Sequence, residues 1–249
     1  MQKDLSDQVK ATYKALRLGL ALLALVFPPL LWFGGRVLGH LPLADSMSAY
    51  YHASNPLDPE SGPAGAGVMR NEFVGILFAV SGLLIAYQGY SRFEDQALNL
   101  AGILAAGIAL LPMKWPSGPN EGWFSPHGGC AVSFFLSIAY VCIFRAGDTL
   151  PLVTDPVKRR RYLEAYRWLG AAMVLLPTLA WILSSVTHSK SGVFLVELLG
   201  IYVFATYWAV KSHEATSTDV DAKAVRGRVK ARPHELADVL RPLPVTLEE

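Results

Sequence analysis

The sequence predicts an all-α protein, a polytopic bundle of six transmembrane helices, and three observations lead to this fold class. Hydrophobic residues make up 52% of the 249 residues and charged residues only 17%, whereas a soluble domain carries about 25% charged residues. The mean hydropathy is +0.33. Long blocks of the chain contain almost no charge, because most of it lies at the two ends and in one loop. Together these observations exclude a soluble globular enzyme, a disordered regulator and a disulfide scaffold.

Six segments are long and apolar enough to be predicted as transmembrane helices. A helix needs about 20 mostly apolar residues to cross roughly 30 Å of hydrocarbon. The apolar runs are continuous rather than alternating, which excludes the strands of a membrane β-barrel. A helix, in contrast, satisfies its backbone polar groups internally. The predicted segments comprise residues 16–38, 73–90, 97–113, 128–145, 168–186 and 192–210.

Several of these segments carry a feature that affects packing or chemistry. The first contains Pro28 and Pro29 and the fifth contains Pro177. Kinks are expected there, because proline removes a backbone donor and crowds the preceding turn. The third segment is rich in alanine and glycine around Gly102, which favours close approach of neighbouring helices. The sixth segment carries an ionisable residue, Glu197, within its apolar run.

The distribution of lysine and arginine predicts the orientation. If the N-terminus is cytoplasmic, the inner side holds nearly all of the 22 basic residues, as the positive-inside rule requires. The inner excess persists when the long C-terminal segment is left out. We therefore expect a multi-pass protein of the bacterial inner (plasma) membrane with both termini in the cytoplasm. The basic residues on the outer side are Arg36, Arg70, Lys114 and Lys190.

This topology divides the chain into three parts. Residues 1–15 form a cytosolic N-terminal segment, residues 16–210 the six-helix transmembrane domain, and residues 211–249 a cytosolic tail.

Polar residues that could take part in chemistry gather on the outer side of the predicted bundle. The first outer loop carries Ser48, Tyr51 and His52, and the fourth segment is entered through His127. Glu197 lies five residues into the sixth segment, or roughly 8 Å below its outer end at 1.5 Å per residue. An ionisable residue within a span is costly and marks a functional site or a partner. The structural alternative, a salt bridge to Arg70 or a hydrogen bond to a histidine, stays open.

These residues suggest a metal site at the outer mouth of the bundle. Two histidines and one carboxylate with an open position form a common catalytic zinc shell, and His52, His127 and Glu197 are the candidate ligands. Zinc would make a bound water nucleophilic near neutral pH. The candidate catalytic residues around it are Ser48, Tyr51, Arg70 and Glu72, with Ser48 or Tyr51 stabilising developing charge. The sequence contains no HExxH motif, and ligands from separate helices leave no local signature.

Residues 48–53, Ser-Ala-Tyr-Tyr-His-Ala, resemble the Ser-x-x-x-His motif of the alkaline ceramidase and adiponectin-receptor-like superfamily. That superfamily comprises seven-helix, zinc-dependent intramembrane lipid amide hydrolases. The resemblance implies that Ser48 stabilises an oxyanion and that His52 binds zinc. The chain departs from the superfamily in three respects. It has six predicted helices, its candidate site faces outward, and Glu197 stands where a His-x-x-x-His pair would be expected.

The whole chain is also similar to a family of uncharacterised bacterial six-helix integral membrane proteins. The similarity rests on the Ser-x-Ser-x-Tyr-Tyr-His segment at residues 46–52, on Phe-Val-Gly at residues 73–75 and on the late helix with Glu197. This resemblance implies no activity.

Three functions remain open from the sequence. The first is a metal-dependent lipid hydrolase whose cofactor is zinc and whose partners are membrane lipids. The second is a transporter or channel for a small ion, a proton or a lipid, with Glu197 and Arg70 in its pathway. The third is a non-catalytic membrane partner or sensor. The sequence contains no nucleic-acid-binding module, and the oligomeric state stays open.

Overall fold

The structure, a computed structural model, describes residues 5–52, 68–113, 125–187, 190–230 and 238–247. It confirms the all-helical bundle. Short helices η1, η2, η3 and α7 join or follow the long ones, and two-residue strands β1 and β2 pair antiparallel. The elements are α1 (Leu5–Gly39), η1 (Ser48–Tyr51), α2 (Arg70–Ala86), α3 (Arg92–Leu110), α4 (Pro126–Tyr140), η2 (Val141–Arg145), η3 (Ala146–Leu152), α5 (Pro156–Thr187), α6 (Lys190–Thr218), α7 (Val220–Val225), β1 (Val229–Lys230) and β2 (Thr246–Leu247).

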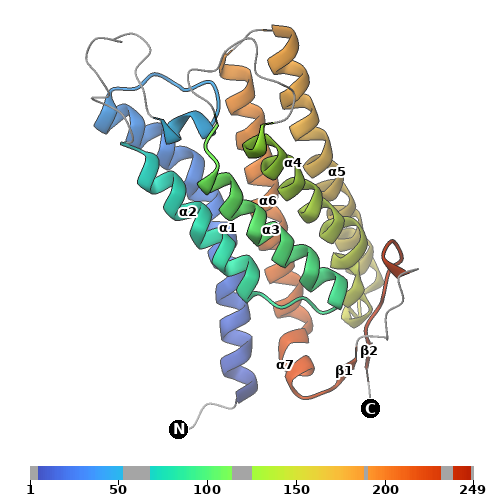
Figure 1. Cartoon of the computed structure of the whole chain (residues 1–249). Helices are drawn as coiled ribbons and strands as arrows, with labels where there is room; N and C mark the ends of the chain where they lie inside the picture. The colour runs from blue at the N-terminus through green and yellow to red at the C-terminus, as the bar shows by residue number, and fades with distance from the viewer. Residues whose placement is uncertain (1–4, 53–67, 114–124, 188–189, 231–237, 248–249) are drawn as a thin grey trace.

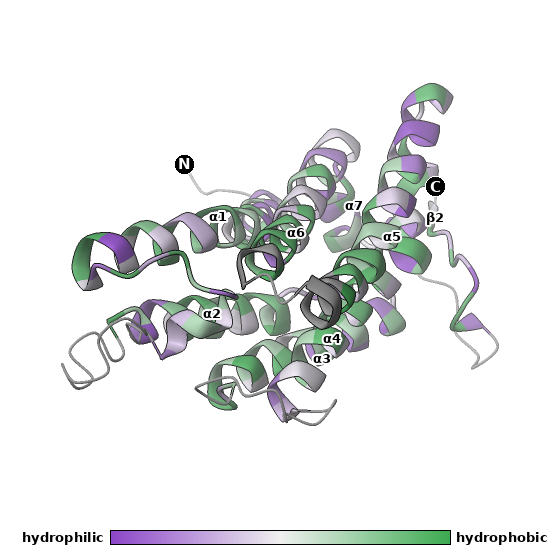
Figure 2. Ribbon diagram, turned by 90° about the horizontal axis from the view of Figure 1, so that it is seen from above, coloured by the Kyte–Doolittle hydropathy of each residue, from purple (hydrophilic) through white to green (hydrophobic). Residues whose placement is uncertain are grey.

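The six long helices form a closed ring. Each helix packs on its neighbours in chain order, and α6 packs on α1 to close the bundle. Seen from above, α6 lies between α1 and α5 (Figure 2). Both chain termini lie at the same end of the bundle (Figure 1), which we name the terminal end, and η1 lies at the opposite, distal end.

Apolar residues occupy both the inner and the outer faces of the helices. On α1, the buried residues Leu20, Ala24, Phe27 and Leu31 recur every three or four positions, which places them on one helical face. The opposite surfaces expose large apolar side chains, and soluble monomers rarely expose extended apolar surface of this kind. Examples on the four helices α1, α3, α5 and α6 are Leu22, Ile103, Leu175 and Leu195.

Within the described part of the chain, three helical stretches are long and apolar enough to cross a membrane: Leu5–Gly39, Pro126–Leu152 and Val193–Thr218. The length and composition of these helices therefore indicate a membrane protein. Helices α2, α3 and α5 overlap the other three predicted segments, although α2 ends at Ala86 and α3 at Leu110, before the predicted ends at residues 90 and 113. Their crossing of the bilayer remains a prediction.

Several helices extend beyond the apolar segments that predicted them. Helix α1 begins at Leu5 instead of residue 16, and α6 continues to Thr218, so the tail boundary predicted at residue 211 falls inside a helix. An apolar run in the sequence identifies only the apolar part of a helix. The helix itself continues into polar residues for as long as its backbone hydrogen bonds are formed. Helix α1 also runs unbroken through Pro28 and Pro29, and α5 through Pro177.

Small residues bring α2, α3 and α4 close together, as predicted for the third segment. A methyl group added at Gly102 of α3 would lie 2.6 Å from Ile85 Cγ1 and 2.9 Å from the Ser81 carbonyl oxygen, both on α2. One added at Gly107 would lie 2.8 Å from Cys130 Sγ of α4. The absence of a side chain at these positions therefore permits the close helix contacts.

The Gly102→Ala substitution should destabilise the bundle. The added methyl group must push α2 and α3 apart, and overpacking of this kind costs about 1–3 kcal/mol. The measurement is the midpoint of thermal unfolding of the purified protein in detergent.

The matched control is Gly82→Ala on α2, where an added methyl group meets no atom within 4 Å. Alanine has the higher helix propensity, so this variant should be unchanged or slightly more stable, by up to about 1 kcal/mol. Equal destabilisation of both variants would contradict the close packing at Gly102.

Candidate functional site

The segment after α1 folds inward at the distal end and places η1 against the bundle. Tyr50 is 1% exposed and its ring packs beside Phe194 of α6. The Met47 backbone N–H donates a hydrogen bond to Glu197 Oε2 at 2.7 Å, and the Phe194 N–H donates to the Asp45 carbonyl oxygen at 3.1 Å. Helix α6 therefore holds the turn that carries the polar residues of this segment.

A second element brings a histidine to this turn. Helix α4 begins with Ser125, whose hydroxyl oxygen accepts a hydrogen bond from the Gly128 N–H, and with Pro126 at the first helical position. Both residue types favour the start of a helix. His127 follows directly and is 7% exposed, so the helix start buries its imidazole against the η1 turn.

Ser48 and His127 form a hydrogen-bonded dyad. His127 Nε2 lies 2.7 Å from Ser48 Oγ, and His127 Nδ1 lies 2.8 Å from the Leu111 carbonyl oxygen. A carbonyl oxygen can only accept a hydrogen bond, so Nδ1 carries the proton of the neutral ring and Nε2 accepts from the serine hydroxyl. This is the geometry of an activated nucleophile, with a base that is oriented by a third group.

The dyad serine faces an apolar cavity of about 110 Å³ inside the ring of helices. Among the residues described around it, Ser48 and Glu197 carry the polar side chains. The other lining residues are Ala24, Phe27, Met47, Phe73, Ile76, Leu77, Val80, Ile108, Ala131, Phe134, Phe135, Ile201 and Phe204. A serine hydroxyl next to a base and an apolar cavity suits chemistry on the carbonyl group of an amphipathic molecule.

The other candidate catalytic residues lie around the dyad but do not join it. Arg70 is exposed, its Nε donates to the Tyr51 carbonyl oxygen at 3.2 Å, and its guanidinium lies 4.8 Å from the centre of the Tyr51 ring. The expected salt bridge between Arg70 and Glu197 is not among the ion pairs of the described residues. Glu72 Oε2 is buried and has no hydrogen-bond partner in the described part of the chain.

The three candidate zinc ligands are each engaged in another interaction. The two ring nitrogens of His127 contact Ser48 Oγ and the Leu111 carbonyl oxygen. His52 Nε2 lies 2.6 Å from the Met113 carbonyl oxygen. Glu197 accepts from the Met47 N–H. Nor do three or more His, Cys, Asp or Glu residues of the described ranges gather in a group that could hold a metal ion. These residues do not fit a zinc site as they are arranged, and zinc binding stays an untested prediction.

The sequence reasoning missed a second polar cluster, at the terminal end. We name it the terminal ion network; its seven charged residues are each at most 4% exposed. Its members are Arg17, Glu94, Arg145, Asp148, Lys211, Glu214 and Asp221.

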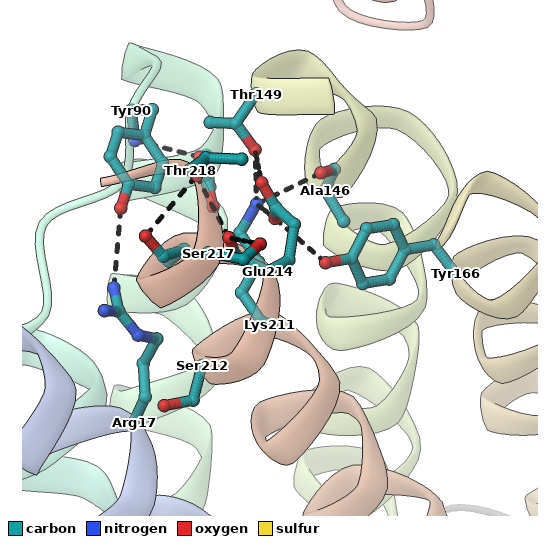
Figure 3. A network of polar contacts seen from close by, with 12 residues as sticks. Arg17, Tyr90, Ala146, Thr149, Tyr166, Lys211, Ser212, Glu214, Ser217 and Thr218 are labelled. Atoms are coloured by element: carbon teal, nitrogen blue, oxygen red, sulfur yellow. Dashed lines mark hydrogen bonds and ion pairs between the residues drawn. The ribbon is translucent and has the colours of Figure 1, made fainter. Parts of the chain in front are cut away.

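Helix α6 supplies one ion pair at the centre of this network (Figure 3). Lys211 Nζ donates to Glu214 Oε2 at 2.8 Å, to Thr149 Oγ1 at 2.7 Å and to the Ala146 carbonyl oxygen at 3.1 Å. The Tyr166 hydroxyl donates to Glu214 Oε2 at 3.0 Å. These contacts join α5, η3 and α6.

A second ion pair joins α1 to α7. Arg17 donates to both carboxylate oxygens of Asp221, at 2.6 and 3.1 Å, and the Tyr90 hydroxyl donates to the same carboxylate at 2.6 Å. Helix α7 comes from the segment predicted as a cytosolic tail, so this pair ties part of the tail to the bundle. One sequence signal could have found the network, since Lys211 and Glu214 lie one turn apart on the direct continuation of an apolar helix.

Burial favours the protonated form of the Glu94 carboxyl in the terminal ion network. The network contains three cations and four carboxyl groups, all buried, and charge balance without water favours one protonated carboxyl. Burial raises the pKa of Glu94 to about 7, against the opposing influence of Lys211 and of the hydrogen bond from the Tyr90 N–H. Glu94 precedes the third apolar segment, and it is the carboxyl that takes up this proton near neutral pH.

Comparison of the chain with models of known protein families, with curated proteins and with solved structures finds no match. The family resemblances of the sequence are therefore not tested by these comparisons, and the geometry carries the functional argument.

The stability of the protein should fall as the pH rises from about 5 to about 8. With a folded-state pKa of about 7 against an ordinary value of 4.5, folded Glu94 keeps its proton where the unfolded chain has lost it. The unfolded state then binds fewer protons, so the free energy of unfolding decreases with pH across this window. Thermal unfolding midpoints in detergent at pH 5.5 and 8 measure the effect.

Glu94→Gln provides the control, because glutamine keeps an oxygen for the Tyr90 N–H and does not titrate. Its unfolding midpoint should depend less on pH than that of the unaltered protein. An unchanged pH dependence in this variant would assign the effect to another group.

Proposed function

We propose that the protein is an integral membrane hydrolase that cleaves a lipid ester, with Ser48 as the nucleophile and His127 as the general base. The observation that carries the proposal is the 2.7 Å contact between Ser48 Oγ and His127 Nε2, with His127 Nδ1 held by the Leu111 carbonyl oxygen. This role for Ser48 differs from the oxyanion-stabilising role that the family resemblance implies.

The dyad would act by acyl transfer. Ser48 Oγ attacks the ester carbonyl carbon while its proton passes to His127 Nε2. The resulting imidazolium donates that proton to the leaving alcohol oxygen as the carbon–oxygen bond breaks, which leaves an acyl group on Ser48. A water molecule then attacks the acyl carbon, gives its proton to Nε2, and the carboxylic acid departs as Ser48 regains its proton. The Leu111 carbonyl oxygen supports the Nδ1–H in each of these states.

A lipid substrate follows from the position of the dyad. The serine faces an apolar cavity within a bundle whose outer surface is apolar, and a molecule that enters it must leave water or the bilayer. The basic residues of the sequence orient the terminal end toward the cytoplasm. The dyad then acts at the outer side of the bacterial inner membrane, in a protein that crosses it six times.

The Ser48→Ala variant should lose hydrolysis of short-chain p-nitrophenyl esters by the purified protein in detergent. It should also lose covalent labelling by a fluorophosphonate probe, which reacts with activated serine hydroxyls. Loss of the base in His127→Gln should lower kcat by about 10²–10⁴-fold, because Ser48 then has no proton acceptor.

Ser46→Ala and His52→Gln are the matched controls. Ser46 lies two residues before Ser48, and its hydroxyl oxygen accepts from the Ala49 N–H, while His52 contacts the Met113 carbonyl oxygen. Both variants should keep labelling and turnover. Full activity of the Ser48→Ala variant would overturn the proposal, and loss of activity on zinc removal by a chelator would favour the metal-dependent hydrolase instead.

A further inference from the structure

The cavity next to the dyad has one polar end and one apolar end. Ser48 and Glu197 lie at the distal end of the cavity, whereas Phe204 on α6 and Val80 on α2 line it farther toward the terminal end. Glu197 and Phe204 are seven residues apart on one helix, which corresponds to roughly 10 Å. A molecule that fills this space must therefore carry its polar group next to Ser48 and its apolar part deeper in the bundle.

The size of the cavity limits the apolar part. Its volume is about 110 Å³, and a protein cavity of about 150 Å³ with apolar walls accommodates benzene, a molecule of six carbon atoms. By this comparison, about four to six carbon atoms of a hydrocarbon chain fit. The fatty acyl chains of bilayer lipids are several times longer, and most of such a chain would extend beyond this volume.

The walls of the cavity suit a hydrocarbon chain. Phe27, Phe73, Phe134 and Phe204 come from α1, α2, α4 and α6 and line the space. Such walls offer no hydrogen-bond partner, so water inside the cavity would be poorly held. The Met47 N–H donates to Glu197 Oε2, and Ser48 lines the same space.

We propose that this cavity is the acyl pocket of the enzyme and that it selects esters with acyl chains of about four to six carbons. The inference rests on the proposed function and adds the substrate class to it. The ester carbonyl lies at Ser48, the acyl chain extends toward Phe204, and the alcohol part remains outside the bundle.

The first measurement is the chain-length profile of ester hydrolysis. A series of p-nitrophenyl esters from acetyl to hexadecanoyl, assayed with the full-length protein in detergent, should show the highest kcat/KM between four and six carbons. A profile that rises steadily to hexadecanoyl would overturn the inference.

Two variants test whether this cavity sets the profile. Phe204→Leu enlarges the inner end and should shift the optimum toward octanoyl, raising kcat/KM for octanoyl relative to butanoyl about tenfold, since a methylene that fits an apolar pocket is worth at least that much. Ala131→Leu fills the side of the cavity and should shift the optimum toward acetyl. Phe78→Leu, an exposed position of α2 that does not line the cavity, should leave the profile unchanged. An unchanged profile in both cavity variants would overturn the inference.

Binding without turnover separates the inference from the proposed function. In the Ser48→Ala variant, hexanoate should raise the thermal unfolding midpoint, because a ligand that binds the folded state stabilises it. Hexadecanoate should not, and the additional Ala131→Leu substitution should abolish the effect of hexanoate. If hexanoate binds in this way but no ester is hydrolysed, the pocket stands and the proposed hydrolase fails. If esters are hydrolysed through Ser48 but neither hexanoate binding nor the profile responds to the cavity variants, the hydrolase stands and the pocket fails.

Discussion

A charged side chain that is shielded from water must find its partner inside the protein, and this constraint organises the terminal end of the bundle. Removing one partner of a buried ion pair costs about 3–5 kcal/mol, because the other charge stays buried without compensation. Arg17 on α1 meets Asp221 on α7, and Lys211 meets Glu214 on α6. Tyr90, in the loop between α2 and α3, donates to Asp221, and Tyr166 on α5 donates to Glu214. The Arg17–Asp221 pair and the contacts of Lys211 and Glu214 with η3 and α5 therefore join separate helices at this end.

Helix α6 connects this network with the candidate site at the opposite end. Lys211 and Glu214 hold the helix at the terminal end, and Glu197 receives the Met47 N–H at the distal end. The position of Ser48 thus depends on a helix that is anchored by charge about four turns away from Glu197. Between the two ends, Phe204, Tyr207 and Trp208 are buried, so the polar groups of the two ends are separated by an aromatic layer. We interpret the terminal end as the structural anchor of the bundle, whereas the distal end holds the Ser48–His127 dyad of the proposed hydrolase.

Much of the fold could be predicted from the sequence, and less of the site. The six apolar segments coincide with the six long helices, because the spacing of apolar residues and the burial of backbone polar groups act locally along the chain. Ser48, His127 and Glu197 were identified as polar residues of one end. Their pairing was not predictable, since Ser48 and His127 are 79 positions apart and a serine–histidine contact leaves no local pattern. Lys211 and Asp221 were assigned to a cytosolic tail because basic and acidic residues beyond an apolar run are normally in water.

The sequence by itself determined that this protein is helical, that its helices are long and apolar, and that Ser48, His127 and Glu197 belong to one end of the bundle. These properties depend on residue composition and on short-range periodicity. Tertiary structure alone decided which polar groups meet. His127 contacts Ser48, Glu197 accepts from the Met47 N–H instead of pairing with Arg70, and Arg17 pairs with Asp221. The reason is physical, because a hydrogen bond or ion pair between separate helices depends on how the helices are placed to within about an ångström. That placement results from the packing of the whole ring.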